Sequence, residues 1–346
     1  MRLFLTGHRG YIGSHAVELF RAAGWHVTGL DAGLYTGTEA EPLVPPDEEI
    51  PLDLAAVEPG MLQGADVVLH LAAISNDPMG ALDPGLTRRV NLDGTLQLAE
   101  AARSAGVGRF LFASSCSIYG ASGDEPVTEE APLAPLSEYA ETKIEAERAL
   151  RGMESDEFLF GALRCATAHG ASPALRTDLA VNNLLAWALA EGSVKLLSDG
   201  SSWRPFAHCR DIARGFLALA NAPASTVRGL SVNFGADEEN FRIREVADLV
   251  HDAVPEAPVS TQPGASVDPR DYRVDFRRLR EALPDFRIEN GVRRSLQGLL
   301  RLYRSRPDFR AEFLDGRYAR LEILRQRLED GALQPLADHR PGGRDA

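Results

Sequence analysis

A run of glycines close to the start of the chain constrains the fold more than any other feature of the sequence. Gly7, Gly10 and Gly13 stand three residues apart, between the short apolar segment 2–6 and segment 14–23, which has the periodicity of a helix. Small residues at these places let the backbone approach a pyrophosphate group, and the first N–H groups of the helix then face that anion. The order of strand, glycine loop and helix predicts a dinucleotide-binding unit; the alternative is an ordinary tight turn into a helix.

Strands and helices alternate through the first half of the chain. Apolar periodicity predicts further strands at 26–30, 66–73, 109–114 and 158–164 and helices at 92–105 and 139–150. Residues 32–50 are rich in Gly, Pro and acidic residues and are predicted to form a loop. The alternation predicts an α/β fold with a Rossmann-like, doubly wound parallel sheet.

The pattern changes near residue 170. Helices are predicted at 179–191, 210–221, 243–254 and 309–328, and the loops between them are rich in Pro and Gly. We therefore predict a dinucleotide-binding domain over 1–170 and a smaller, mainly helical substrate-binding region over 171–333, with some strands returning to the sheet. Residues 334–346 are predicted to be a polar tail.

Composition excludes several classes of partner. The 346 residues include 44% apolar residues, enough for a large core, and carry a formal net charge of −13. This charge argues against nucleic acid or an anionic membrane as the main partner, and no apolar run reaches the ~18 residues of a membrane span. Three cysteines without zinc spacing predict no metal and fit a reducing, cytoplasmic location.

An acid at the end of the second predicted strand indicates which dinucleotide binds. Asp31 follows that strand, where a carboxylate accepts hydrogen bonds from the adenosine ribose and repels a 2′-phosphate. This favours NAD over NADP. Arg9, inside the glycine loop, is the residue that would bind a 2′-phosphate instead. Asp53 and Leu54 follow the next short apolar stretch and are candidates to meet the adenine amino group.

A tyrosine and a lysine four residues apart suggest proton transfer. Tyr139 and Lys143 begin a predicted helix, and this spacing places them on one helical face. A nearby ammonium favours the phenolate and lowers the pKa of the phenol, so Tyr139 can act as a base toward a sugar or alcohol hydroxyl. Ser115 follows a predicted strand at the carboxyl edge of the sheet and can hydrogen-bond the same hydroxyl. A surface Tyr–Lys pair and loop-capping serines are the alternatives.

Together these motifs resemble a family. The glycine loop, His70 to Ala73, Asn91 with Gly94, Ser115 and the Tyr139/Lys143 pair occur in the order found in extended short-chain dehydrogenases. Over about residues 1–290 the chain is similar to the branch of NAD-dependent epimerases and dehydratases that act on nucleotide-linked sugars. The resemblance implies that Tyr139 is the base, that Lys143 holds it and the nicotinamide ribose, and that Ser115 assists.

The resemblance also implies two sets of binding residues and a partner class. The partner is a nucleotide-diphosphate sugar. Residues expected to bind NAD are Gly7, Arg9, Gly10, Tyr11, Ile12, Gly13, Asp31, Asp53, Leu54, Leu71, Ala72, Ala73, Asn91, Tyr139 and Lys143. Residues expected to bind the substrate are Ser75, Ser115, Cys116, Ser117, His169, Arg176, Asn182, Arg204 and Arg270. Among these, Asn182, Arg204 and Arg270 lie where relatives contact the nucleotide diphosphate, and His169 is equally well read as a satisfied buried histidine.

Departures from the family pattern bear on the reaction. Sugar 4,6-dehydratases place Asp-Glu where this chain has Cys116 and Ser117, and 3,5-epimerases place a cysteine where it has Ser117. The second acid–base position of the 3,5-epimerases falls on Arg176, which stays protonated. A 4-epimerase needs only Tyr139, Ser115, Lys143 and bound NAD, and is therefore favoured. A ketoreductase using NADP(H), a 4,6-dehydratase and a 3,5-epimerase remain alternatives, as does an NAD-sensing regulator without turnover.

A homodimer is the expected assembly. Relatives pair the helices predicted at 92–105 and 139–150 across a two-fold axis. Leu96, Leu98, Ala99 and Ala102 are candidates for the contact face. The alternative is that these residues only cover the sheet.

Overall fold

Parallel strands form the centre of the molecule, which we describe from a computed structural model covering residues 1–331 except 124, 263, 264 and 266. In this part of the chain one sheet has seven strands, in the order β10-β6-β5-β4-β1-β2-β3, with every neighbouring pair parallel. The strands are β1 (Arg2–Thr6), β2 (His26–Leu30), β3 (Glu48–Ile50), β4 (Val67–His70), β5 (Arg109–Ser115), β6 (Leu159–Cys165) and β10 (Leu230–Phe234). The predicted doubly wound α/β fold is confirmed.

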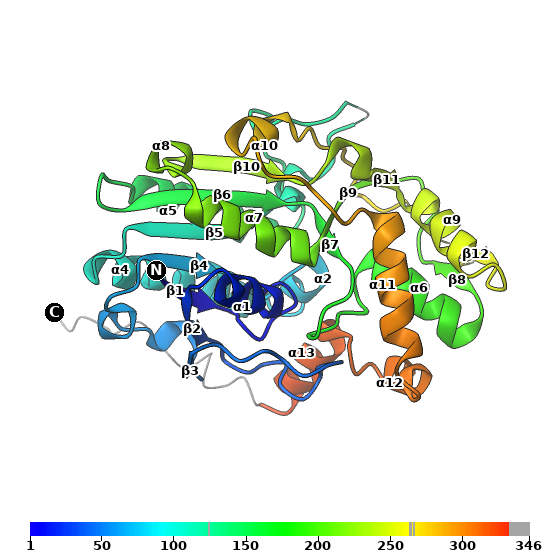
Figure 1. Ribbon diagram of the computed structural model, residues 1–346. Helices are drawn as coiled ribbons and strands as arrows, with labels where there is room; N and C mark the ends of the chain where they lie inside the picture. The colour runs from blue at the N-terminus through cyan, green and yellow to red at the C-terminus, as the bar shows by residue number, and fades with distance from the viewer. Residues whose placement is uncertain (124, 263–264, 266, 332–346) are drawn as a thin grey trace.

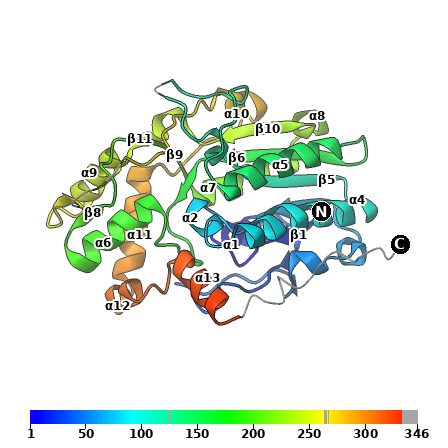
Figure 2. The same ribbon diagram turned by 180° about the vertical axis from the view of Figure 1, so that it is seen from behind.

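Helices cover both faces of this sheet because successive side chains of each strand point to opposite sides. Leu3 and Leu5 of β1 pack with α1 (Gly13–Ala22) and α7 (Cys209–Asn221), whereas Phe4 packs with α4 (Gly94–Ser104) and α5 (Glu138–Gly152). Figures 1 and 2 show the two layers from opposite sides. Continuous apolar strands are therefore required here, as the sequence of β4 and β5 shows.

The helix α4 does not present its apolar face to a partner. Leu98, Ala99 and Ala102 are fully buried under the sheet, and Leu96 packs against the same cluster. The contact face predicted for a dimer is thus used to cover the sheet, which was the alternative reading. The helix also begins later than predicted, at Gly94, after a π-helical turn over Arg89–Asp93.

Two other predicted elements need correction. The segment 32–50 is not all loop, because Glu48–Ile50 adds β3 to the sheet edge beside β2. Its acidic composition hid a short strand with little apolar surface. The helix predicted at 309–328 is two helices, α12 (Phe309–Leu314) and α13 (Arg320–Glu329). Gly316 breaks the helix with a φ of 76°, a left-handed conformation that glycine adopts without a steric penalty.

The C-terminal region forms a second core beside the carboxyl edge of the sheet. Helices α6 (Ala180–Glu191), α9 (Ile243–Ala253), α11 (Val292–Arg304) and α12 share one apolar cluster with β8 (Val194–Leu196) and β9 (Trp203–His208). The remaining elements of the described residues are short: α2 (Asp77–Gly80), α3 (Pro84–Arg88), α8 (Ala224–Val227), α10 (Arg277–Ala282), β7 (Thr167–His169), β11 (Asn240–Arg242) and β12 (Val259–Thr261). The unpredicted α11 carries the chain back across this region.

The last described helix returns to the N-terminal half. Leu324 of α13 is buried against Ile74, Met79 and Leu86, with Leu34 beside them. Both views show α13 next to α2 and the loop that follows β2 (Figures 1 and 2). No helix among the described residues is long and apolar enough to span a membrane. The predicted polar tail, 334–346, lies outside the described residues.

Strand order fixes where a ligand crevice forms. The strand β1 pairs with β2 on one side and β4 on the other, so chain connections leave β1 in opposite directions at this point. In open α/β sheets, ligands bind outside the carboxyl ends of the strands at such a reversal. The glycine loop and the residues that follow β2, β4 and β5 all lie at that edge.

Candidate active site

The glycine loop has a geometry that only glycine permits. Gly7 has a φ of 73°, and its carbonyl accepts the N–H of Gly10 at 2.9 Å. A Cβ at Gly13 would overlap the carbonyl oxygen of Gly7, and a Cβ at Gly10 would lie 2.9 Å from the same oxygen. The glycines are therefore required for the loop to fold tightly against the start of α1, the arrangement in which backbone N–H groups can approach a pyrophosphate.

Asp31 lies beside this loop and is held by backbone groups. Its carboxylate accepts the N–H of Arg9 at 3.1 Å and that of Gly33 at 2.8 Å. The Arg9 guanidinium, in turn, donates to Glu49 at 2.6 Å, and His8 Nε2 lies 3.0 Å from the same carboxylate oxygen. The cation that a 2′-phosphate would need is thus already paired with a carboxylate on β3.

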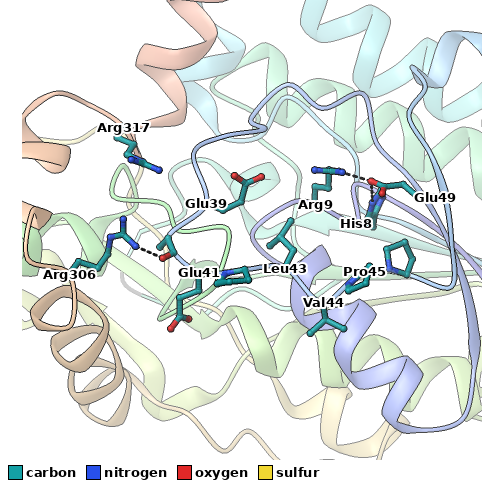
Figure 3. A pocket seen from close by; sticks show the side chains of 13 residues that line it. His8, Arg9, Glu39, Glu41, Leu43, Val44, Pro45, Glu49, Arg306 and Arg317 are labelled. Atoms are coloured by element: carbon teal, nitrogen blue, oxygen red, sulfur yellow. Dashed lines mark hydrogen bonds and ion pairs between the residues drawn. The ribbon is translucent and has the colours of Figure 1, made fainter.

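A pocket of ≈ 520 Å³ opens next to these groups. Figure 3 shows Arg9 and His8 turned toward Glu49, with Glu39 and Glu41 farther along the wall and Arg306 at the other end. Among the described residues three glutamates line the pocket, and its arginines are already paired, Arg9 with Glu49 and Arg306 and Arg317 with Glu312. An added phosphate there would therefore meet negative charge and no unpaired cation. This environment agrees with NAD, the cofactor predicted from Asp31.

The other residues predicted for NAD line or support this edge. Leu71, Ala72 and Ala73 follow β4 and are partly buried, and the Ala72 nitrogen lies 2.8 Å from where a Cβ of Gly7 would stand. Asn91 is buried and clamps the backbone of Ile74 through both its side-chain atoms, at 2.8 and 2.9 Å.

Four more of the predicted NAD residues make contacts that stabilise the fold. Asp53 caps a short helical turn by accepting the N–H of Ala55, and Leu54 is buried in the core. The Tyr11 hydroxyl donates to the carbonyl of Gly170 at 2.5 Å, and Ile12 packs beside it. Tyr11 therefore fixes the glycine loop to the C-terminal region.

Ser115, Tyr139 and Lys143 converge at the ends of β5 and α5. Ser137 caps α5 by accepting the N–H of Ala140, which starts the helix two residues before Tyr139. The Lys143 ammonium donates to the carbonyl of Ala113 at 2.9 Å and lies 5.7 Å from the centre of the Tyr139 ring. The structure thus brings together the three residues predicted to be catalytic.

Burial dominates the electrostatics of this group. It raises the pKa of Tyr139 above its usual value, while a hydrogen bond with Ser115 and the Arg176 cation act in the opposite direction and Asp77 adds to the rise. Burial also lowers the pKa of Lys143 to about 8. The structure therefore does not give Tyr139 the low pKa that the sequence predicts, because burial has the largest effect on the phenol and disfavours the phenolate.

Arginines of the C-terminal region meet carboxylates in the crevice. Arg176 binds Asp178 in a bidentate pair at 2.6 and 3.1 Å, and donates to Ser75 at 2.9 Å. Arg204 and Arg270 both bind Asp268, at 2.9 and 2.8 Å. The acids were missed in the sequence, although the short spacings Arg176–Asp178 and Asp268–Arg270 were visible signals.

One ion pair links the two halves of the molecule close to Tyr139. Arg270 donates to Asp77 at 2.8 Å, and Asp77 also accepts the hydroxyl of Ser137, the cap of α5. Asp77 is near enough to raise the pKa of Tyr139. A substrate diphosphate that reached Arg270 would therefore compete with a carboxylate beside the candidate base.

Three predicted substrate residues do not face the crevice. Cys116 is fully buried, and its thiol donates to the carbonyl of Arg164 at 3.1 Å. Asn182 is fully buried, and its side-chain amide forms hydrogen bonds with Gly170, Tyr11 and Arg176. His169 is fully buried against Ser295, 3.0 Å away.

The residues that follow Asn182 and Cys116 in the sequence are more exposed than these two. Asn183, one residue after Asn182, is partly exposed and was missed in the sequence. Ser117 is partly exposed, but its hydroxyl oxygen is buried and has no hydrogen-bond partner among the described residues.

Burial raises the pKa of the Cys116 thiol well above its usual value, which leaves it unreactive at neutral pH.

The sequence of this chain is similar to those of known proteins. The family model for the NAD dependent epimerase/dehydratase family matches residues 3–235. A UDP-glucose 4-epimerase of Mycolicibacterium smegmatis is 30% identical over 320 residues, covering 86% of this chain and 98% of that protein. UDP-glucuronic acid decarboxylase 1 of Danio rerio is 27% identical, covering 86% of this chain and 72% of that protein.

Solved structures agree with this relationship. TunA, an NAD dependent NDP-hexosamine 5,6-dehydratase involved in tunicamycin biosynthesis, superposes with a TM-score of 0.78 at 25% identity, covering 88% of this chain and 98% of that chain. MoeE5 in complex with UDP-glucose and NAD gives a TM-score of 0.77 at 28% identity, covering 88% of this chain and 99% of that chain. The family match over two thirds of the sequence and the relative that is 30% identical lead to one conclusion: this chain belongs to the NAD-dependent epimerase/dehydratase family.

Proposed function

We propose that this protein is an NAD-dependent epimerase that inverts C4 of a nucleotide-diphosphate sugar. The observation that carries the proposal is the assembly of Ser115, Tyr139 and Lys143 beside a glycine loop, with no second reactive acid–base group of the kinds that we predicted from the family. Cys116 is turned into the core, and Arg176 is bound to Asp178. Elimination of water and epimerisation next to a carbonyl both need such a second group, whereas inversion at C4 does not.

The side chains suit removal of a proton from a sugar hydroxyl. Tyr139 accepts the proton of the C4 hydroxyl, and Ser115 holds that oxygen in reach by a hydrogen bond. NAD held by the glycine loop, Asp31 and Lys143 would supply both the acceptor and the donor for the C4 hydride. After the keto sugar turns over in the crevice, Tyr139 returns its proton to the C4 oxygen, so the sugar differs only in configuration.

Lys143 holds the reactive end of the crevice in place. Its ammonium is fixed by the Ala113 carbonyl and faces the Phe112 ring, whose centre is 4.6 Å away. A cation in this position favours phenolate at Tyr139 and so acts against the effect of burial. We expect Lys143 to contact the nicotinamide ribose as well, as the family pattern implies.

The choice of cofactor rests on Asp31 and on the pairing of Arg9 with Glu49. Asp31 supplies a hydrogen-bond acceptor for the ribose. Glu49 binds the Arg9 guanidinium, which is then not free to bind a 2′-phosphate. NAD that stays bound suits an epimerase, because the hydride leaves and returns within one turnover. A ketoreductase would instead release an oxidised cofactor after each cycle.

Product analysis tests the proposal. Purified protein is incubated with UDP-glucose, UDP-N-acetylglucosamine, UDP-glucuronic acid and dTDP-glucose, without added reductant, and products are resolved by NMR and mass spectrometry. We expect a C4 epimer of unchanged mass from at least one substrate, with the C4 hydrogen retained. Loss of water or of carbon dioxide would assign a dehydratase or decarboxylase. Turnover only in a parallel incubation with added NADPH, with consumption of that NADPH, would assign a reductase. Solvent deuterium at C3 or C5 would favour a 3,5-epimerase, and NAD binding without turnover would favour a regulator.

We also propose a homodimer, on the basis of the family resemblance alone. The apolar residues of α4 predicted for the interface face the sheet instead. Light scattering at micromolar concentration tests the assembly, and a monomer would refute it.

A further inference from the structure

The helix α13 brings a buried cation into the crevice. Arg320, at its first turn, is 8% exposed, and its guanidinium makes no hydrogen bond or ion pair with any described residue. Its carbon Cζ lies 4.5 Å from the centre of the Tyr35 ring, in the loop after β2. An arginine this deeply buried normally has a carboxylate or phosphate partner, because removing its charge from water is costly.

The carboxylate with the largest electrostatic effect on Arg320 already has partners. Asp178 forms its bidentate pair with Arg176 and accepts a further hydrogen bond from Asn76 at 3.1 Å. Of the two arginines, only Arg176 binds this carboxylate, so the cluster of Arg176, Asp178 and Arg320 carries an excess positive charge. Burial and the neighbouring Arg176 lower the pKa of Arg320 to about 10, while Tyr35, Asp178 and Asp31 act in the opposite direction.

The surroundings hold Arg320 in place. The carbonyl of Tyr318 accepts the N–H of Thr177, which lies between Arg176 and Asp178, at 3.0 Å. The Tyr318 hydroxyl donates to Glu312 at 2.7 Å, and the ring is buried. The chain entering α13 is thus tied directly to the arginine–aspartate pair.

The position of this cluster follows from its neighbours at both ends of the crevice. At one end of the crevice, Asp31 and Tyr35 are near enough to raise the pKa of Arg320. At the other end, Arg176 is near enough to lower the pKa of Tyr139. Tyr11, in the glycine loop, acts on Arg176 as well. A dinucleotide with its adenosine at Asp31 and its nicotinamide at Tyr139 would have its two phosphates between these points, with the glycine loop on one side.

We propose that Arg320 is a binding residue for the cofactor diphosphate, contributed by a C-terminal helix that closes the crevice on the side opposite the glycine loop. The ligand class is a dinucleotide pyrophosphate, whose negative charge would balance the arginine cluster. The solved relatives are matched over nearly their full length yet cover 88% of this chain, so this chain has residues without a counterpart in them. The inference rests on NAD binding and does not depend on which sugar reaction is catalysed.

Binding measurements test the inference. Arg320→Gln removes the charge, and Arg325→Gln is the matched control, since Arg325 lies on the same helix but pairs with Glu322 at the surface. Titration calorimetry on cofactor-free protein compares NAD, ADP-ribose, adenosine and UDP. We expect Arg320→Gln to weaken NAD and ADP-ribose by about 10-fold or more, because a hydrogen bond between charged groups is lost. Adenosine, which has no phosphate, and UDP should bind as before, and Arg325→Gln should leave all four unchanged.

Thermal unfolding without ligand separates this role from a structural one. Because Arg320 is a buried cation without its own counter-ion, Arg320→Gln should unfold at the same temperature as the parent protein or higher. Unchanged affinity for NAD and ADP-ribose in a folded Arg320→Gln variant would overturn the proposal. An equal loss for adenosine would show that α13 only shapes the adenosine pocket, and a loss confined to UDP would assign Arg320 to the substrate; either result would also overturn it. If the variant unfolds early, Arg320→Lys decides: it should keep part of the affinity for ADP-ribose, and none retained in a folded Lys variant would contradict the proposal.

Discussion

The two halves of the molecule build their shares of the crevice differently. The N-terminal half supplies backbone N–H groups, Asp31 and the Ser115/Tyr139/Lys143 group directly from the ends of strands and from the first turns of α1 and α5. The C-terminal half supplies arginines that already hold carboxylates, as Arg270 holds Asp268 and Asp77. The first set is ready for ligands, whereas the second must exchange partners when a ligand arrives. Cofactor and substrate should therefore respond differently to mutation.

The largest effect is expected where the N-terminal half performs the chemistry. Tyr139→Phe deletes the proton acceptor and keeps the packing of the ring, so turnover should fall by about 10²–10⁴-fold or more. NAD affinity should stay nearly unchanged, as calorimetry can show. Ser115→Ala should cost less, because it removes a hydrogen bond and not the base, and Cys116→Ser should be nearly silent. A strong loss in Cys116→Ser would mean that the thiol reaches the substrate.

A second test concerns the burial of Lys143. The pKa of Lys143 falls from 10.5 to about 8 on folding, so the unfolded chain binds more protons between these pH values. The destabilisation from the buried ammonium is fully present below pH 8 and disappears as the pH rises toward 10.5, amounting to roughly 3 kcal/mol. In unfolding titrations, wild type should therefore gain stability relative to Lys143→Met across this window. A constant difference between the two proteins would show that Lys143 keeps an ordinary pKa.

The C-terminal half is tested at Arg270. We expect Arg270→Gln to weaken UDP binding by about 10-fold, through loss of a charge-assisted hydrogen bond, while NAD affinity stays the same. The control is Arg278→Gln, because Arg278 carries the same charge on the surface and pairs with Glu130. Equal weakening of NAD and UDP would show that Arg270 holds the crevice together, through Asp77, more than it binds substrate.

The smallest effect is expected at the adenosine end. Asp31→Ala removes a ribose acceptor and a repulsive charge, so the preference for NAD over NADP should narrow by about 10-fold in calorimetric titrations. Glu58→Ala, an exposed acid of the same half, is the control and should leave the ratio unchanged. A clear preference of the parent protein for NADP would overturn the assignment and favour a reductase.

The same contrast explains what could be predicted from the sequence. The strand, glycine loop and helix at residues 2–22, and the Tyr139/Lys143 pair, are local patterns whose spacing is set by strands and helices. The partners of Arg270 are not local: Asp77 lies 193 residues away, and no spacing rule joins them. The burial of Cys116 depends on side-chain direction after a strand end, which a shift of one residue reverses. The burial of Asn182 depends on which face of α6 packs inward. Tertiary packing also decided that α4 covers the sheet.

The placement of α13 has a consequence for how the protein is made. Residues 7–13 leave the ribosome more than three hundred residues before Arg320, which at about 5–20 residues per second means some tens of seconds. During that time the glycine loop and Asp31 can already be folded while Leu324 has not yet packed against Ile74 and Met79. Under the proposal for Arg320, a dinucleotide that enters an unfinished chain is enclosed when synthesis ends. The protein would then bind its cofactor during synthesis and exchange it slowly afterwards, at the rate at which α13 detaches.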